Sequence, residues 1–357
     1  MAESGGTEDT QGTGDPGNIP NIGNPTDRRS SSAAAPASAA SAPPAAADPV
    51  RLVRGVCPVL EVPFHDDGTV DEPGFATVVD EVLRTGVGSV LFPGFASEFH
   101  KLSEPERDSL TEVLLARTRD RSDVAAVLAV QDQATHPAIR RAGALVAAGA
   151  DLINLLPPYA PASAALHPAN IREHLSAVLD AVAPVPVVLQ YAPALTGTTM
   201  NVATMQEIAL DHPNLRLVKV ESVPPGPTIS ALASGEPKLP ALVGYAGVHW
   251  PDAAARGAIG VQPGCSFVEV YLRIWQHYVA GEVEQAEDLH RRLLPYLSGW
   301  MSDSSLIVSA EKLISHRRGW FASPHCRAPA RELDRAEIAM VDRFLAEFGS
   351  FWSDRVG

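Results

Sequence analysis

The stretch LRLVKVES, residues 215–222, places one lysine, Lys219, inside a run of apolar and β-branched residues. Runs of this kind form buried strands, where an unpaired ammonium group is costly. Lysine is also scarce, because the chain has only Lys101, Lys219, Lys238 and Lys312. The stretch therefore predicts a buried strand whose lysine has a chemical purpose.

Seven further runs of the same kind occur between residues 56 and 264. They are rich in Val, Ile and Leu and often end at Pro or Gly, which is typical of parallel strands buried on both faces. These runs are VCPVLEVPF (56–64), SVLFPG (89–94), VAAVLAV (124–130), LINLLPP (152–158), VPVVLQYA (185–192), ALVGYAG (241–247) and AIGVQPG (258–264).

Stretches with helical periodicity fill the gaps between these runs. One of them opens with Ser103 and has Glu106 three residues later, which is the pattern of a capping box. Eight strands alternating with helices predict a parallel sheet closed into a (β/α)8 TIM barrel. A doubly wound open sheet is the alternative, and the count of eight favours the barrel.

Further helical stretches follow the last predicted strand. The first would complete the barrel, and the others predict a C-terminal helical extension packed against it. We expect residues 49–265 to form the barrel core and 266–357 to continue it as part of the same folding unit. The stretches lie near residues 266–280, 282–299, 303–318 and 334–348.

Residues 1–48 differ in composition from the rest of the chain. They are almost all Gly, Ser, Ala, Pro and small polar residues and contain no aromatic residue. Such a segment cannot bury enough apolar surface to offset its ordering entropy, so it is predicted to be a disordered tail. It lacks the basic start and continuous apolar stretch of a secretory signal.

Charge and cysteine content narrow the class of protein further. The formal net charge of −14 disfavours nucleic-acid binding, and no apolar run is long enough to cross a membrane. Cys57, Cys265 and Cys326 are few and far apart, which predicts a reducing compartment without a disulfide framework. We therefore expect a cytoplasmic protein.

Active sites of (β/α)8 barrels lie at the carboxyl ends of the strands. Polar side chains follow several of the predicted strands at that point, and the barrel would bring them to one mouth. They are Glu98, Tyr159, Tyr191, Lys219, Tyr245 and Gln262.

Alternation along a strand puts Lys219 on the same face as Leu215 and Leu217. Inside the barrel this lysine would be partly desolvated, and a neutral amine can attack a carbonyl carbon to form a Schiff base. Tyr191, on the preceding strand, is the candidate proton carrier. The alternative is that Lys219 pairs with Glu221 at a solvated strand end.

Several motifs occur in a fixed order between about residues 54 and 348. Each is weak alone, but their order and spacing are specific. They are VPFHDDGTVD (62–71), GFASEFHKLSEPER (94–107), AGADLINLLPPY (148–159), VLQYAP (188–193), LVKVES (217–222), ARGAIGVQPG (255–264), EKLISHRRGW (311–320) and CRAP (326–329). In these motifs the chain resembles the dihydrodipicolinate synthase/N-acetylneuraminate lyase superfamily of class I, Schiff-base barrels.

The resemblance implies roles for individual residues. Lys219 would be the imine-forming lysine and Tyr191 the proton-transferring tyrosine. Ala96 and Ser97 would lie in the loop that holds the carboxylate of a 2-oxo acid such as pyruvate. Phe95, Tyr159 and Gln262 are the further candidates for substrate binding.

The chain also departs from the family pattern. Phe95 and Ala96 stand where the family has two loop threonines, and Leu195 stands where an arginine receives the second substrate's carboxylate. The Tyr-Asn-x-Pro motif is one residue short before Pro193. These departures argue against the lysine-pathway synthase and sialic acid lyase reactions, and Phe95 predicts a narrower or more apolar acceptor site.

The favoured function is a Schiff-base lyase or aldolase acting on a 2-oxo acid. The alternatives are a dehydratase of a sugar-derived 2-oxo acid by the same imine chemistry, and a non-catalytic ligand-binding relative. The sequence has no HxH or HExxH pattern that would support metal-dependent chemistry, and no GxGxxG follows a predicted strand. No metal or cofactor is therefore expected. The resemblance also implies a homo-oligomer, a tetramer or a dimer.

Overall fold

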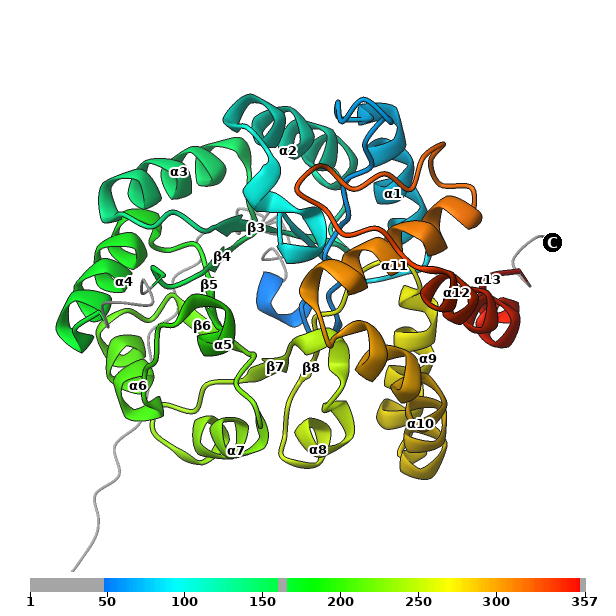
Figure 1. Ribbon diagram of the computed structural model, residues 1–357. Helices are drawn as coiled ribbons and strands as arrows, with labels where there is room; N and C mark the ends of the chain where they lie inside the picture. The colour runs from blue at the N-terminus through cyan, green and yellow to red at the C-terminus, as the bar shows by residue number, and fades with distance from the viewer. Residues whose placement is uncertain (1–47, 160–165, 354–357) are drawn as a thin grey trace, which may run out of the picture. The chain divides into compact units, whose positions relative to one another are not determined.

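The computed structural model describes residues 48–159 and 166–353. Eight parallel strands alternate with helices in a (β/α)8 barrel, followed by C-terminal helices, which confirms the predicted fold (Figure 1). The strands are β1 (Gly55–Val56), β2 (Ser89–Phe92), β3 (Ala125–Val130), β4 (Leu152–Leu155), β5 (Val187–Tyr191), β6 (Leu215–Val220), β7 (Ala241–Val243) and β8 (Gly260–Val261).

The sheet closes on itself through the chain that follows β1. The hydrogen-bonded strand order runs from β1 through β8, β7, β6, β5, β4 and β3 to β2. Val59, just beyond β1, then forms parallel bridges to Leu91 of β2 and to Gly264 after β8. This ring brings the carboxyl ends of all eight strands to one end of the barrel.

Helices surround the barrel, and four shorter turns are 3-10 helices. The α-helices are α1 (Glu72–Arg84), α2 (Glu104–Thr118), α3 (Thr135–Ala148), α4 (Pro168–Val182), α5 (Pro193–Thr196), α6 (Val202–Asp211), α7 (Gly226–Ser234), α8 (Trp250–Ala255), α9 (Val268–Ala280), α10 (Val283–Trp300), α11 (Ser304–Arg317), α12 (Arg335–Phe348) and α13 (Ser350–Ser353). The 3-10 helices are Pro49–Arg51, Phe95–Ser97, Phe99–Lys101 and Tyr245–Gly247. No helix of the described residues is both long and apolar enough to span a bilayer.

The predicted tail lies outside the described residues, apart from Asp48. The Asp48 side chain accepts a hydrogen bond from the Val50 amide and caps the first 3-10 helix. Its other carboxylate oxygen lies 3.0 Å from Nη2 of Arg216, at the start of β6. The described chain is therefore fastened to the barrel from its first residue.

Alternating residues of each strand point inward or toward the helices. Val188 and Leu217 belong to the small apolar cluster inside the barrel, whereas Leu189 and Val218 belong to the larger layer between strands and helices. Because parallel strands keep paired residues on one face, the register then fixes where each polar side chain points.

The predicted shared face of Leu215 and Lys219 is wrong. The register between β5 and β6 shifts after Val187, so that Val187 pairs with Leu215 and Val188 with Leu217. The shift leaves Arg216 exposed and turns Leu215 toward the helices. Leu217 and Lys219 keep the interior face.

Candidate active site

A cavity of about 220 Å³ opens at the carboxyl ends of the strands. Lys219 of β6 lines it, together with residues that follow β1, β2, β7 and β8. Helix α11 lies beside the strand ends near β8 and supplies another wall (Figure 1). The cavity lies where the barrel rule places an active site.

Lys219 is paired with an acid inside the barrel. Its Nζ atom lies 3.2 Å from Oε1 of Glu221, and the two side chains are 6% and 7% exposed. The sequence also suggested that Lys219 pairs with Glu221 at a solvated strand end. The pair is present, but it is buried rather than solvated. In so little water, moving a proton between the two groups replaces an ion pair with a neutral pair.

A chain of side-chain hydrogen bonds holds Glu221 in place across three neighbouring strands. Gln190 of β5 donates to Oε2 of Glu221 at 2.7 Å, and Asn154 of β4 donates to Gln190 at 2.8 Å. The Tyr245 amide approaches Oε1 at 3.4 Å. A Cβ atom on Gly244 would lie 2.3 Å from Cγ of Glu221, so the glycine makes room for this carboxylate.

Tyr191 does not join this group. Lys219 is paired in register with Gln190, and Tyr191 is paired with Val220, on the opposite face of the strands. Tyr191 packs in the layer between strands and helices, where its hydroxyl accepts a 3.4 Å hydrogen bond from the Met200 amide. In the Tyr-Asn-x-Pro motif the tyrosine stands three residues before the proline. The residue three before Pro193 is Gln190, so Gln190 rather than Tyr191 occupies the tyrosine position of the motif.

Three of the predicted substrate-binding residues line the cavity with Lys219. Phe95 and Ala96 form one side after β2, and Gln262 follows β8. Gln262 donates to Sγ of Cys57 at 3.3 Å, and its Oε1 atom has no hydrogen-bond partner among the described residues. Tyr245 also lines the cavity.

The other two predicted substrate-binding residues, Ser97 and Tyr159, do not line the cavity. The Ser97 hydroxyl is fully engaged, since it accepts from the Gly94 amide at 2.9 Å and donates to the Leu60 carbonyl. Its bonds hold the loop after β2, so it cannot replace the missing threonine hydroxyl. The Tyr159 amide is held by Gln133 at 2.6 Å, beside residues 160–165, which lie outside the described part.

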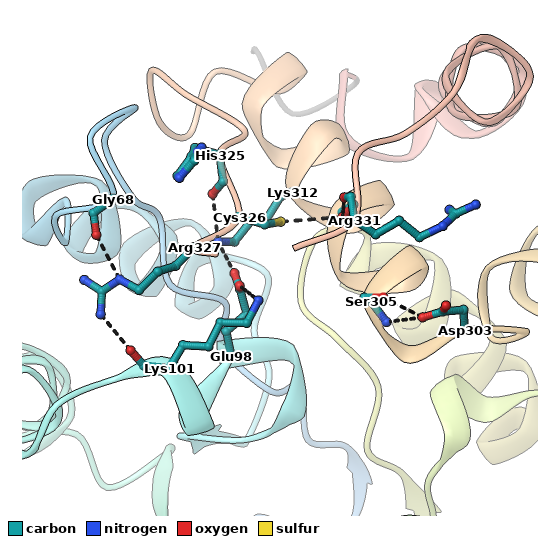
Figure 2. A network of polar contacts seen from close by, with 11 residues as sticks. Gly68, Glu98, Lys101, Asp303, Ser305, Lys312, His325, Cys326, Arg327 and Arg331 are labelled. Carbon is teal, nitrogen blue, oxygen red and sulfur yellow. Dashed lines mark hydrogen bonds and ion pairs between the residues drawn. The ribbon is translucent and has the colours of Figure 1, made fainter. Parts of the chain in front are cut away.

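Glu98 braces the barrel mouth through two lysines. Figure 2 shows its carboxylate between Lys101 and Lys312. Lys101 lies 2.7 Å away, and Lys312, on α11, is fully buried and also donates to the His325 carbonyl at 3.0 Å. Arg327 completes the network by donating to the Gly68 and Lys101 carbonyls at 2.8 Å (Figure 2). The network fastens the loop after β2 to the C-terminal helices.

Backbone strain is concentrated at the same end of the barrel. Among the described residues, the non-glycine residues with positive φ are Glu98 (53°), Tyr245 (55°) and Ala246 (49°). They follow β2 and β7, and two of them line the cavity. Strained conformations of this kind persist where the surrounding structure fixes them, often at functional sites.

Two acids that no sequence motif marked as functional come together in the cavity region. Glu311 of α11 lines the cavity, and Glu61, beyond β1, is buried nearby. Burial, with a smaller contribution from Glu61, raises the pKa of Glu311 to about 8. Burial raises the pKa of Glu61 to about 7, against the opposing effect of a Ser315 hydrogen bond. Nothing in the strand pattern points to a helix residue so late in the chain.

The described residues contain no group of three or more His, Cys, Asp or Glu placed to hold a metal ion. The chemistry available at the cavity is that of the buried Lys219 amine, its neighbouring carboxylate and the amide side chains around them. Such a set can bind a carbonyl compound covalently and move protons around it.

Comparison with curated proteins finds relatives that match this chain over nearly their whole length. L-2-keto-3-deoxyarabonate dehydratase of Azospirillum brasilense is 25% identical, over 84% of this chain and 97% of the relative. YagE of Escherichia coli, named as a proposed 2-dehydro-3-deoxy-D-gluconate aldolase, is 25% identical over 83% of this chain and 97% of its own. A 4-hydroxy-tetrahydrodipicolinate synthase of Kineococcus radiotolerans is 28% identical, over 85% and 96%.

Solved structures show the same relationship. The crystal structure of YagE in complex with pyruvate matches with a TM-score of 0.74 and 25% identity, over 83% of this chain and 98% of that one. The family model for the dihydrodipicolinate synthetase family matches residues 52–347. That match covers most of the chain and confirms the resemblance drawn from the motifs, so the protein belongs to the dihydrodipicolinate synthetase family.

Proposed function

We propose that the protein is a class I lyase that binds a 2-oxo acid as an imine on Lys219. The observation that carries the proposal is the position of the Lys219 amine, which is buried inside the barrel and lines a cavity at the mouth. Family membership supports it, because relatives are named as aldolases, dehydratases and synthases.

The amine attacks the C2 carbonyl carbon, and the carbinolamine loses water to give the imine. In the lyase direction the C3–C4 bond then breaks, the C4 hydroxyl gives up its proton, and an aldehyde leaves. The remaining enamine takes a proton at C3, and hydrolysis releases pyruvate and the free lysine. In a dehydratase the same imine loses a proton from C3 and expels the C4 hydroxyl as water.

We assign the proton transfers to Glu221 rather than to Tyr191. Glu221 is the acid in contact with the Lys219 amine, and Gln190 fixes its second oxygen. It can accept the proton of the attacking ammonium and return it to the hydroxyl that leaves the carbinolamine. Tyr191 faces the other side of the strand and is separated from these steps.

The substrate carboxylate has a candidate position beside Phe95 and Ala96. Both residues line the cavity, and within the described residues their backbone N–H groups have no hydrogen-bond acceptor. The role expected for this loop is therefore supported for Ala96 through its backbone, while Ser97 acts by holding the loop. Assembly into a homo-oligomer and a cytoplasmic location stay predictions.

Borohydride reduction in the presence of pyruvate tests the proposal. The chain has four lysines, two of which, Lys101 and Lys312, are paired with Glu98. Peptide mapping should therefore locate the adduct without ambiguity. We expect it on Lys219 in the wild type and in the control Lys238→Arg, which alters an exposed lysine, and no adduct in Lys219→Arg. An unmodified Lys219 across a panel of 2-oxo acids would remove the proposal.

Analysis of the reaction products distinguishes the lyase, the dehydratase and the non-catalytic ligand-binding relative. Release of an aldehyde from 2-dehydro-3-deoxy-D-gluconate indicates a lyase, and loss of water without carbon–carbon cleavage indicates a dehydratase. Imine formation without any turnover would favour the ligand-binding relative.

A further inference from the structure

One face of α11 forms the wall of the cavity that Lys219 also lines. The residues that contribute are Ser304, Ile307, Val308 and Glu311, which are spaced three or four apart and therefore share a helix face. Glu311 is the only charged residue of this wall. Its position in the cavity has no role in the imine chemistry proposed above.

The Glu311 carboxyl is buried without a counter-charge. The residue is 3% exposed, and its Oε1 atom has no hydrogen-bond partner among the described residues. A Cβ atom on Gly264 would lie 2.0 Å from Oε2, so the bare glycine after β8 leaves the space that this carboxyl fills. The carboxyl is thus built into the cavity wall.

The two cations that act on the neighbouring acid Glu61 are already paired with other acids. Lys312, the next residue on α11, pairs with Glu98, and Arg318 binds Glu269 through two contacts of 2.6 and 3.1 Å. The remaining neighbour is a second buried acid, Glu61, which accepts from Ser315 one turn further along α11. Burial and this like charge both favour the neutral form, and they raise the pKa of Glu311 to about 8.

The rest of the cavity is short of positive charge. Of the residues that the structure describes, the charged ones in the lining are Lys219, Glu221 and Glu311, and no arginine or histidine is among them. Most other lining side chains are apolar, and Leu195 is one of them. The apolar set is Val59, Phe95, Ala96, Leu195, Ala246, Pro263, Met301, Ile307 and Val308.

We infer that Glu311 is a specificity-determining residue, whose uncharged carboxyl hydrogen-bonds a hydroxyl or carbonyl oxygen of the substrate beyond C3. This inference rests on the proposed imine at Lys219. A hydroxylated 2-oxo acid satisfies the buried O–H and C=O groups of Glu311, which otherwise lack partners. A substrate with a second carboxylate would bring another anion to a cavity with two glutamates and no free cation among its lining residues.

A competition experiment on the full chain tests the inference. The protein is reduced with borohydride in equimolar pyruvate and either 2-dehydro-3-deoxy-D-gluconate, which has an uncharged hydroxylated tail, or 2-oxoglutarate, which has a second carboxylate. The pyruvate is labelled with carbon-13, so that mass spectrometry of the Lys219 peptide distinguishes its adduct from the unlabelled adducts of the other acid, including the three-carbon adduct left by cleavage. The variants are Glu311→Gln, which keeps an uncharged polar group, Glu311→Leu, which removes the polar group, and Glu332→Gln as an exposed control.

We expect the wild type to prefer the hydroxylated acid over 2-oxoglutarate by about tenfold or more, which corresponds to about 1.4 kcal/mol. Glu311→Gln and Glu332→Gln should keep that ratio within about threefold, and Glu311→Leu should lower it by about tenfold while pyruvate labelling persists. Persistent pyruvate labelling also shows that the leucine variant is folded.

Two results would overturn the inference while leaving the lyase proposal intact. One is an unchanged ratio in Glu311→Leu, and the other is a ratio that shifts strongly toward 2-oxoglutarate in Glu311→Gln, which would mean that Glu311 works as an anion. Absence of any adduct at Lys219 in the wild type would instead remove the lyase proposal and this inference with it.

Discussion

The Nζ atom of Lys219 lies 3.2 Å from Oε1 of Glu221, with both side chains more than nine-tenths buried. The acid lies two residues beyond the lysine, so the alternation of the strand carries both to the inside of the barrel. An amine and a carboxylate confined in this way can exchange a proton without releasing charge to water. The pair combines a nucleophile with the group that can activate it.

Glu221→Gln should slow the exchange of the pyruvate methyl protons for deuterium, which reports enamine formation and needs no second substrate. General acid–base groups contribute about 10²- to 10⁴-fold to such steps, so a loss in that range is expected by NMR. Glu236→Gln, at an exposed position, serves as the control. An exchange rate within about threefold of the wild type would show that Glu221 does not carry the proton.

Tyr191→Phe should change the same exchange rate by less than about threefold. The hydroxyl faces away from the cavity, and its hydrogen bond to the Met200 amide is long, at 3.4 Å. The variant and the wild type are compared at equal pyruvate saturation. A loss of 100-fold or more would return the proton-transfer role to the tyrosine.

Lys312→Met should lower the free energy of unfolding by about 3–5 kcal/mol, because it leaves Glu98 buried without one of its cations. Denaturant titration measures the difference. Lys101→Met, whose native side chain is 10% exposed, should cost less. Adding Glu98→Gln to Lys312→Met should recover part of the loss, and a double variant less stable than both single variants would contradict this account.

The buried acids Glu61 and Glu311 should make the protein less stable as the pH rises from about 4.5 to about 8. Their pKa values are raised from 4.5 to about 7 and about 8 in the folded chain. Across that window the folded chain retains protons that the unfolded chain has released, so the free energy of unfolding falls with pH. Below the window both states are protonated, and above it both are ionised.

The double variant Glu61→Gln, Glu311→Gln should remove that slope when urea unfolding is compared with the wild type at several pH values. The other titratable groups are the same in both proteins, so their effect on the pH dependence of stability cancels in the comparison. They include the cations Lys312 and Arg318, which act on Glu61. Parallel stability curves for the two proteins between pH 4.5 and 8 would show that the carboxyls do not hold protons in this window.

The barrel was readable from the chain because each of its repeats is a local pattern. LINLLPP and VPVVLQYA contain strands β4 and β5, and Ser103 caps α2 with Glu106 as the capping box predicts. The C-terminal helices fell within a few residues of the expected ranges. These features depend on neighbours along the chain, which is the information that periodicity carries.

The site was only partly readable, because a one-residue offset decides which face a side chain takes. Tyr191 was the obvious aromatic candidate, but Gln190 is the residue paired with Lys219. The shift at Val187 likewise moved Leu215 to the outer face. The position of Glu221, two residues after Lys219, indicated that the two side chains share a strand face. No sequence pattern indicated that Glu311 would reach the cavity.

The sequence by itself determined the family, the eightfold alternation and the identity of the buried lysine, since each is written in order and spacing. The tertiary structure decided which groups surround that lysine. Lys219 of β6, Glu311 of α11 and the residues that follow β1, β2, β7 and β8 meet at one cavity only after the strands take their register and α11 packs beside the strand ends. Register and helix packing are set by contacts between residues far apart in the chain, and no local pattern records them.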